Sequence, residues 1–302
     1  MLDAVLVTGV VPAPGLWELT RGNKRLLIMG TLDPVPRNIQ WTSAKVERRI
    51  AEADVILGPP GISAGTNVGL IRGAMLLPAY NRSKRNPDGR RLQDVLPAAM
   101  YARWQAAKQA YLGRNAGVEH LRPVHAAKTL YDAAIKRAGM SSESIVKLVV
   151  ERVAKSHRIP VLSTSYKLVI RDPKATLKVL NVTSLDDLSC MEQTLDRLQT
   201  DLNAMAQRAN AWSTGDVATL RAMPYVDHRK ACVGSLAGNA IARQQGITDI
   251  DAQVQDAWLK QARAALASHN TVFATLPVAS LFKEHGVLGV LAREGFTVKP
   301  PE

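Results

Sequence analysis

Cysteine and aromatic residues are scarce in this 302-residue chain. Only two cysteines occur, Cys190 and Cys232, and neither belongs to the Cys-x-x-Cys pair of a zinc ribbon or a thioredoxin-like redox motif. Aromatic residues make up 5% of the sequence and no known nucleic-acid-binding module frames its basic residues, so we do not expect it to bind nucleic acid. Taken alone, the two cysteines also fit buried free thiols, as in a cytosolic protein.

Long apolar runs are also missing. No stretch of eighteen uncharged apolar residues occurs, so the sequence predicts no transmembrane segment. The first twelve residues lack a basic start and contain Asp3, which argues against a signal peptide in the chain as given. Both a mature exported protein and a cytosolic protein are compatible with this beginning.

Common catalytic motifs are absent as well. None of the six histidines has the His-Glu-x-x-His spacing of a zinc peptidase, and no Gly-x-Ser-x-Gly elbow is present. The glycine-rich stretch 58–65 lacks the Lys-Ser/Thr ending of a phosphate-binding loop and contains two prolines. We interpret it as a linker that borders a cleft.

Charge is strongly biased toward the positive sign, with a formal net charge of +13. The densest basic segment contains Arg82, Lys84, Arg85, Arg90 and Arg91. A basic surface attracts acidic polymers and lipid head groups. The alternative is a solvated loop whose charge serves only solubility, and the residues leave both interpretations open.

Hydrophobic periodicity predicts strands near both ends of the chain and helices between them. The predicted fold class is therefore α+β with α/β character: a central mixed sheet built from N- and C-terminal strands, surrounded by a large, mostly helical middle region. Trp104, Trp212 and Trp258 fall on predicted helices and are expected in the core. Stretch 70–80 is ambiguous between strand and helix. The predicted strands are 17–20, 26–29, 55–57, 160–164, 271–275 and 296–298, and the predicted longer helices are 44–53 (capped by Ser43), 92–112, 119–137, 142–157, 184–212, 250–268 and 286–294.

Two motif frames lie at opposite ends of the chain. In the first, an apolar strand leads into Gly30-Thr-Leu-Asp33, and a second apolar strand ends at Gly58-Pro59. In the second, an apolar strand leads into Pro277-Val-Ala-Ser280, followed by a helix and Gly295-Phe-Thr-Val. This layout resembles the TraB/GumN family, relatives of the Tiki-type metal-dependent peptidases, and its GumN-like branch most closely. The resemblance covers roughly residues 15–300.

The resemblance implies a metal site that this sequence does not retain. In the family both turns read Gly-x-x-His and the second strand ends in Glu, a set that holds a divalent metal and activates water. Asp33 and Ser280 stand at the histidine positions, Pro59 at the glutamate position and Pro277 at the second glycine, whereas Gly30 is kept. We therefore predict no resident metal, although Asp33 and Ser280 should still face one cleft beside Pro59.

The resemblance also carries expectations about domains, compartment and partners. Residues 1–14 would be an N-terminal extension, and 15–302 a single domain with a helical insertion at about 92–268. An exported, periplasmic or secreted protein would carry a Cys190–Cys232 disulfide. Its function would be to bind an anionic polysaccharide or another envelope protein through the old cleft or the basic segment. The alternatives are a metal-assisted hydrolase using Asp33, a structural or assembly protein such as a homodimer, and a cytoplasmic location.

Overall fold

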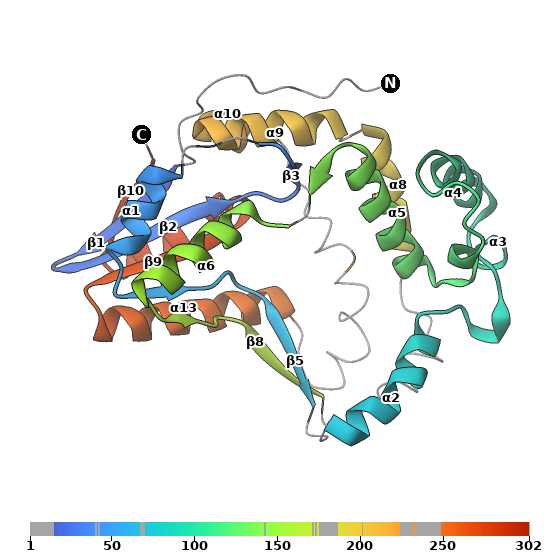
Figure 1. Ribbon diagram of the computed structural model, residues 1–302, viewed down its shortest axis with the longest axis horizontal. Coiled ribbons are helices and arrows are strands. Elements are labelled where there is room, and N and C mark those ends of the chain that lie inside the picture. Colours follow the sequence, from blue (N-terminus) through green and yellow to red (C-terminus); the bar gives the residue numbers. More distant parts are fainter. Residues whose placement is uncertain are drawn as a thin grey trace.

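A computed structural model describes residues 15–39, 41, 43–66, 70–141, 143–170, 172, 174, 187–200, 202–223, 232 and 249–301. Figure 1 shows a β-sheet covered by helices at one end of the molecule and a separate group of helices at the other. The predicted extension 1–14 lies outside the described residues. No helix in the described part of the chain is long and apolar enough to cross a bilayer.

The main sheet has six strands in the order β10-β1-β2-β9-β4-β7. β1 pairs antiparallel with both β2 and β10, whereas β2, β9, β4 and β7 run parallel. The sheet therefore joins N-terminal to C-terminal strands, which confirms the predicted fold class. Its members are β1 (Leu16–Arg21), β2 (Lys24–Thr31), β4 (Val55–Leu57), β7 (Val161–Leu162), β9 (Thr271–Pro277) and β10 (Thr297–Lys299).

Helices cover both faces of this sheet because its central strands are apolar on both faces. Side chains alternate along β2: Leu26 and Ile28 join one hydrophobic cluster with Trp258, and Leu27 and Met29 join another with Ile50. The result is an α/β/α arrangement, which we call the sheet part. The first face carries α13 (Ile250–Ser268), α14 (Val278–Leu281) and α15 (Val287–Arg293), and the second carries α1 (Ala44–Ala51), α6 (Ile145–His157), α9 (Leu202–Thr214) and α10 (Val217–Ala222).

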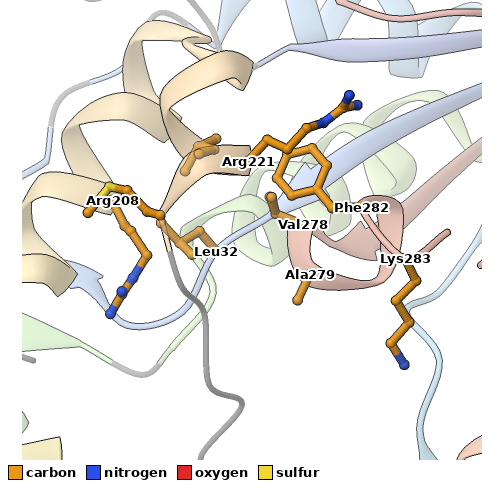
Figure 2. Close-up of a pocket in the computed structure, with 9 residues that line it drawn as sticks. Leu32, Arg208, Arg221, Val278, Ala279, Phe282 and Lys283 are labelled. Atoms are coloured by element: carbon orange, nitrogen blue, oxygen red, sulfur yellow. The ribbon is translucent and has the colours of Figure 1, made fainter.

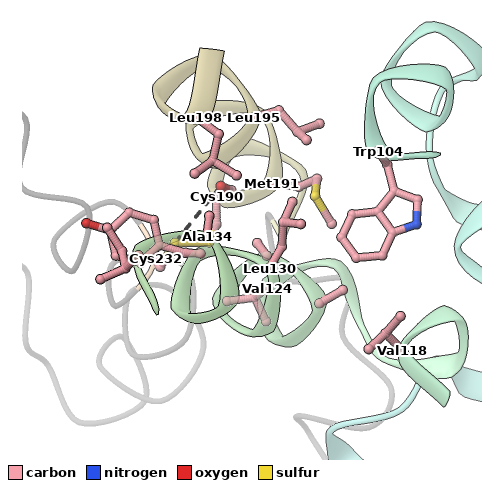
Figure 3. Close-up of a cluster of buried hydrophobic side chains, with 14 of the residues drawn as sticks. Trp104, Val118, Val124, Leu130, Ala134, Cys190, Met191, Leu195, Leu198 and Cys232 are labelled. Atoms are coloured by element: carbon pink, nitrogen blue, oxygen red, sulfur yellow. Dashed lines mark hydrogen bonds between the residues drawn. A yellow bond between two sulfur atoms is a disulfide. The ribbon is translucent and has the colours of Figure 1, made fainter. Parts of the chain in front are cut away.

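The remaining helices build a second core, which we call the helical lobe. Trp104, Leu130 and Met191 are fully buried there (Figure 3). The stretch 92–268 thus divides between two cores, since α6, α10 and α13 pack on the sheet instead, and α9 contributes Met205 to this core and Trp212 to the sheet part. The lobe consists of α3 (Leu92–Val95), α4 (Ala98–Tyr111), η2 (Gly117–His120), α5 (Pro123–Arg137) and α8 (Asp187–Thr200).

Two small sheets and one helix connect these parts. β3 (Val35–Pro36) pairs with β6 (Met140–Ser141), and β5 (Ile62–Thr66) pairs in parallel with β8 (Tyr166–Ile170). Figure 1 shows β5 and β8 running from the sheet part toward α2 (Leu70–Ser83), which a one-turn 3₁₀ helix, η1 (Pro87–Gly89), follows. The ambiguous stretch 70–80 is therefore helical.

Several predicted boundaries were wrong, chiefly at prolines. The helix predicted over 92–112 is interrupted because Leu96, which precedes Pro97, is extended. The helix predicted from Glu119 begins at Pro123, a residue favoured in the first turn. Of the helix predicted over 184–212, the structure describes α8 and α9, which together extend to Thr214, and residues 184–186 and 201 lie outside the described residues.

Two local interpretations also failed. Stretch 58–65 is not wholly a linker, because Ile62 begins β5. The Ser43 hydroxyl makes no capping hydrogen bond to the backbone and instead donates to the Glu47 carboxylate.

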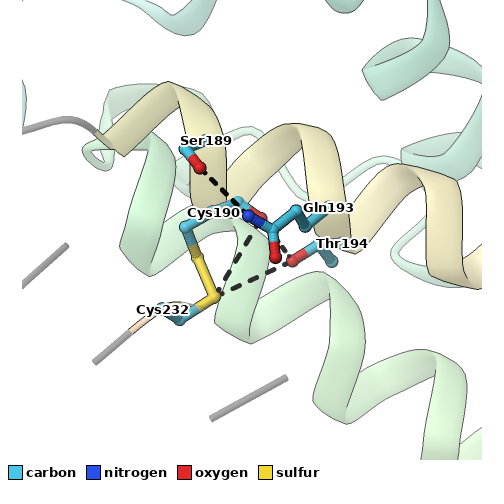
Figure 4. Close-up of a disulfide and its surroundings, with 5 residues drawn as sticks. All are labelled: Ser189, Cys190, Gln193, Thr194 and Cys232. Carbon is cyan, nitrogen blue, oxygen red and sulfur yellow. Dashed lines mark hydrogen bonds between the residues drawn. A yellow bond between two sulfur atoms is a disulfide. The ribbon is translucent and has the colours of Figure 1, made fainter. Parts of the chain in front are cut away.

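Cys190 and Cys232 form the disulfide expected from the resemblance (Figure 4). It joins α8 to a residue 42 positions further along the chain, with a Cα–Cα distance of 4.8 Å. Cys190 is fully buried in the core of the helical lobe, and Thr194 Oγ1 donates to its carbonyl oxygen at 2.7 Å. Closing a loop of this length contributes about 4 kcal/mol in the chain-entropy description.

Candidate functional site

Three parallel strands of the sheet part end at the same edge, which we call the carboxyl edge. β9 lies between β2 and β4, with Thr31 opposite Pro277 and Leu57 opposite Ala274. In open sheets of parallel strands, ligands bind outside the carboxyl ends of the strands. The carboxyl edge is therefore the first place to look for a functional site.

The family positions identified in the sequence gather at this edge. Asp33 follows the end of β2 by two residues, Pro59 follows the end of β4 by two, and Ser280 lies in α14 directly after β9. Asp33 and Ser280 are half-buried, and Pro59 is exposed. Because β2, β4 and β9 run parallel, their carboxyl ends lie at the same edge of the sheet, even though these three residues are far apart in sequence.

Gly30 is held in a tight contact at the end of β2. A Cβ atom there would lie 3.0 Å from both Trp17 Cζ3 and Val278 Cγ2, closer than ordinary van der Waals contact. In addition, Trp212 Nε1 donates to the Gly30 carbonyl at 2.8 Å. Packing alone therefore accounts for glycine at this position. Pro277, at the second glycine position, forms the N-cap of α14.

A cavity of about 290 Å³, which we call the basic cavity, opens beside Asp33 and Ser280. Their chain neighbours Leu32 and Ala279 line it (Figure 2). Among the residues that the structure describes, the charged side chains that line it are all cationic: Arg208 from α9, Arg221 from α10 and Lys283 after α14. The remaining lining is apolar and comes from Leu220, Met223, Val278 and Phe282.

A second cavity, of about 310 Å³, lies at the same edge, and we call it the hydroxyl cavity. Pro59 lines it together with Thr31 and Thr275, and Thr164 Oγ1 lies 2.9 Å from the carbonyl oxygens of both Gly58 and Pro59. Further lining side chains are Ser144, Lys147, Glu151, Ser163 and Ser165. Among the described residues, these two cavities flank the end of β2, and neither is lined by Asp33 or Ser280. That Asp33 and Ser280 face one shared cleft stays a prediction.

Fold and site together define an α/β/α protein with its candidate site at the carboxyl edge of a mixed sheet. A model of the TraB/PrgY/gumN family matches residues 15–300, so the chain belongs to this family. No curated protein and no solved structure matches this chain.

The side chains at the family positions do not fit a tightly held divalent metal. Asp33 offers one carboxylate, serine hydroxyls are weak ligands, and Pro59 has no ligating atom in its side chain. Among the described residues, no three His, Cys, Asp or Glu side chains form a group able to hold an ion. We therefore derive no chemistry through a metal, and the expectation that none is bound remains a prediction.

The basic segment lies elsewhere, from the last turn of α2 to the residue before α3, and its backbone is fixed to the helical lobe. Arg85 forms a β-bridge with Leu121, the Arg122 N–H donates to the Lys84 carbonyl at 2.9 Å, and the Asn86 N–H donates to the His120 carbonyl, also at 2.9 Å. These bonds hold the backbone at residues 84–86 in place, so the charged side chains of the segment extend from fixed positions.

Four of its five cations are exposed and form no ion pair with any residue the structure describes: Arg82, Arg85, Arg90 and Arg91. The fifth, Lys84, places its ammonium group 4.2 Å from the centre of the Tyr80 ring.

His125 on α5 has a lowered pKa, and Lys84 is one of its causes. Burial first, and then the charges of Arg122, Lys84 and Lys128, lower its pKa from 6.5 to about 4.

The basic cavity could not be predicted from the sequence. Arg208, Arg221 and Lys283 come from three elements and share no motif, so only the packing of α9, α10 and α14 around the end of β2 brings them together. The basic segment, by contrast, could be read directly, because its charges are neighbours along the chain.

Proposed function

We propose that this protein is an exported, non-hydrolytic member of its family that binds an acidic polysaccharide through the basic segment. The observation that carries the proposal is the group of exposed guanidinium groups, at Arg82, Arg85, Arg90 and Arg91, on a backbone fixed by hydrogen bonds. Guanidinium groups bind carboxylates and sulfates through paired N–H donors. A polymer with regularly repeated acidic groups can contact several of them at once.

Loss of hydrolysis is supported by side-chain chemistry at the carboxyl edge. A metal-dependent hydrolase needs ligands that bind the ion and leave one position open for water. Asp33, Ser280 and Pro59 supply one strong ligand among them. The alternative, a metal-assisted hydrolase that uses Asp33, would need ligands from elsewhere in the chain.

Export is supported by the Cys190–Cys232 disulfide, because structural disulfides persist in oxidising compartments and are rare in the cytosol. An acidic polysaccharide outside the cytoplasm is a partner consistent with that compartment. A nucleic acid is disfavoured because stacking platforms are scarce in a chain with 5% aromatic residues.

The test is binding to polygalacturonate, a chemically defined acidic polysaccharide, measured by titration calorimetry over a series of salt concentrations. The affinity should fall steeply with salt, since several ion contacts form together. The triple variant Arg85→Gln/Arg90→Gln/Arg91→Gln should lower it by roughly tenfold or more. A matched control, Arg48→Gln/Lys260→Gln/Arg293→Gln, removes the same charge from exposed positions of the sheet part and should change the affinity far less.

Two results would overturn the proposal. Equal losses in both triple variants would mean that only net charge matters and that the basic segment is a solvated loop. A near-stoichiometric divalent ion, found by elemental analysis and lost in Asp33→Ala, would instead favour the metal-assisted hydrolase.

A further inference from the structure

The hydroxyl cavity lies between the carboxyl edge of the sheet and the start of α6. Side chains alternate along each strand, and Met29 of β2 and Phe273 of β9 point to the face that α6 covers. Thr31 and Thr275, two residues further along the same strands, therefore point to this face as well, and both line the cavity. Ser144, the N-cap of α6, lines it from the helix. The cavity is thus bounded by the sheet on one side and by α6 on the other.

Several hydroxyl groups in this cavity have no hydrogen-bond partner among the residues that the structure describes. Thr275 is only 6% exposed, and its hydroxyl makes no hydrogen bond to any of them. The Ser144 side chain does not cap α6. Buried hydroxyls normally have a partner, because an unpaired one costs free energy, and a molecule in the cavity that bonds to them would remove this cost. The unpaired set consists of the hydroxyls of Thr31, Ser144, Ser165 and Thr275.

The wall around these hydroxyls is held by hydrogen bonds of its own. Thr164 is fully buried, and its Oγ1 lies 2.9 Å from the carbonyl oxygens of both Gly58 and Pro59. The Gly58 N–H donates to the Leu162 carbonyl at 3.0 Å, which joins the end of β7 to the end of β4. Because these bonds form the wall in the free protein, a ligand would need to order little of the chain when it binds.

The charges that line the cavity offset each other. Lys147 Nζ lies 3.7 Å from Glu151 Oε1, one turn further along α6, and both side chains are exposed. Among the described residues, these are the only charged side chains in the lining. Apolar side chains, among them those of Ile56 and Val150, line the remainder. The ligand that matches this lining is therefore uncharged, carries several hydroxyl groups and also has apolar surface.

We propose that the hydroxyl cavity binds one neutral sugar ring. A pyranose has hydroxyl groups around its edge, each able to donate and to accept a hydrogen bond, and C–H groups on its faces. The unpaired hydroxyls of the cavity bond to the edge of the ring, and Ile56 and Val150 contact a C–H face. A volume of about 310 Å³ is at the small end of ligand sites and accommodates one ring but not a polymer.

The same chemistry occurs in a free monosaccharide and in the terminal residue of an oligosaccharide. The site is separate from the basic segment, and it does not depend on the function proposed above, because its ligand is uncharged.

The test uses three neutral hexoses, glucose, galactose and mannose, as probes. Cyclohexanol, a ring with a single hydroxyl, and inorganic sulfate, an anion, are the comparison ligands. Binding to the full chain is followed by backbone NMR shifts at Ser165 and Thr275. At least one hexose should bind with a dissociation constant on the order of 1 mM. Cyclohexanol and sulfate should each bind roughly tenfold more weakly, because cyclohexanol forms fewer hydrogen bonds and sulfate has no apolar surface.

Variants then locate the site. Thr275→Val removes one hydroxyl but keeps the shape of the side chain, and it should weaken hexose binding roughly fivefold. Thr271→Val is the matched control, because Thr271 lies at the opposite end of β9 and does not line the cavity; it should leave the affinity unchanged. Ser144→Trp should abolish binding by filling the cavity, and no capping hydrogen bond is lost from α6.

Each outcome decides for or against the proposal. It would be overturned if no hexose bound, if cyclohexanol or sulfate bound as tightly as the best hexose, or if the two threonine variants had equal effects. If Ser144→Trp does not fold, the threonine pair still decides. A disaccharide of the bound hexose that binds more tightly than the monosaccharide would identify a chain end as the source, and one that binds more weakly would identify a free sugar. Hexose binding should survive the triple substitution in the basic segment, and its loss there would contradict this location.

Discussion

The sheet part and the helical lobe are held together by different means. In the sheet part, apolar side chains alternate between two faces, and helices cover both. The helical lobe is smaller and adds buried polar contacts: Arg122 Nε donates to Asp187 Oδ2 at 2.9 Å, and Lys108 Nζ donates to Glu119 Oε1 at 2.6 Å. It also contains the disulfide.

This difference has a general reason. A sheet buried on both faces gains most of its stability from apolar area, which depends little on pH or redox state. A small helical core buries less, so ion pairs and a covalent bond contribute a larger share. The helical lobe should therefore be the part of the molecule that responds to reduction, to acid and to single charge changes.

The largest effect is expected from Arg122→Met. It leaves Asp187 buried without its bidentate partner, and breaking a buried pair from one side lowers stability by about 3–5 kcal/mol. Denaturant unfolding measures the loss. Lys128→Met is the control on the same helix; its exposed pair with Asp132 should contribute less than about 1 kcal/mol. Similar losses in both variants would contradict the distinction between buried and exposed pairs.

Removing the disulfide should have a slightly smaller effect. Cys190→Ala/Cys232→Ala should lower stability by about 4 kcal/mol or somewhat less, because the unfolded chain regains the freedom of a 42-residue loop. Hydrogen exchange should show faster opening in α5 and α8 and little change in β2 and β9. Uniform acceleration over both parts would mean that they unfold as one unit.

Gly30→Ala tests the sheet part where α14 packs on β2. The added methyl group would press on Trp17 and Val278, and overpacking of this kind lowers stability by about 1–3 kcal/mol. Gly58→Ala is the matched control, since its nearest neighbour, the Leu162 carbonyl oxygen, is 3.4 Å away. Thermal unfolding of the two variants should separate them, and equal melting temperatures would contradict the packing argument.

The smallest effect concerns pH. The folded His125 has a pKa of about 4, against 6.5 in a free side chain, so between these values the unfolded chain takes up a proton that the folded chain does not. Stability should therefore fall as the pH drops from about 6.5 to 4, by on the order of 1 kcal/mol after allowance for partial exposure. Unfolding curves at pH 7 and pH 5 measure this, and His125→Gln should reduce the difference. NMR titration of His125 checks the pKa directly.

Much of the fold could be predicted from local pattern. Strands with alternating or continuous apolar residues were correct at both ends of the chain, and Trp104, Trp212 and Trp258 are buried as expected. Errors occurred where one residue overrides a pattern, as at Pro97, or where pairing depends on a distant partner, as for β5 with β8. The Cys190–Cys232 pairing came from the family resemblance and not from the spacing of the residues.

For the candidate site, too, one part could be predicted from the sequence and another part could not. The sequence alone determined which residues occupy the family positions, and therefore that Asp33, Pro59 and Ser280 bind metal poorly. It also determined the run of positive charge between Arg82 and Arg91. Only the tertiary structure decided that β9 lies between β2 and β4, which brings positions 33, 59 and 280 to one edge. It also decided that Arg208 and Lys283 share a cavity, because contacts between distant segments depend on how whole elements pack and not on neighbours along the chain.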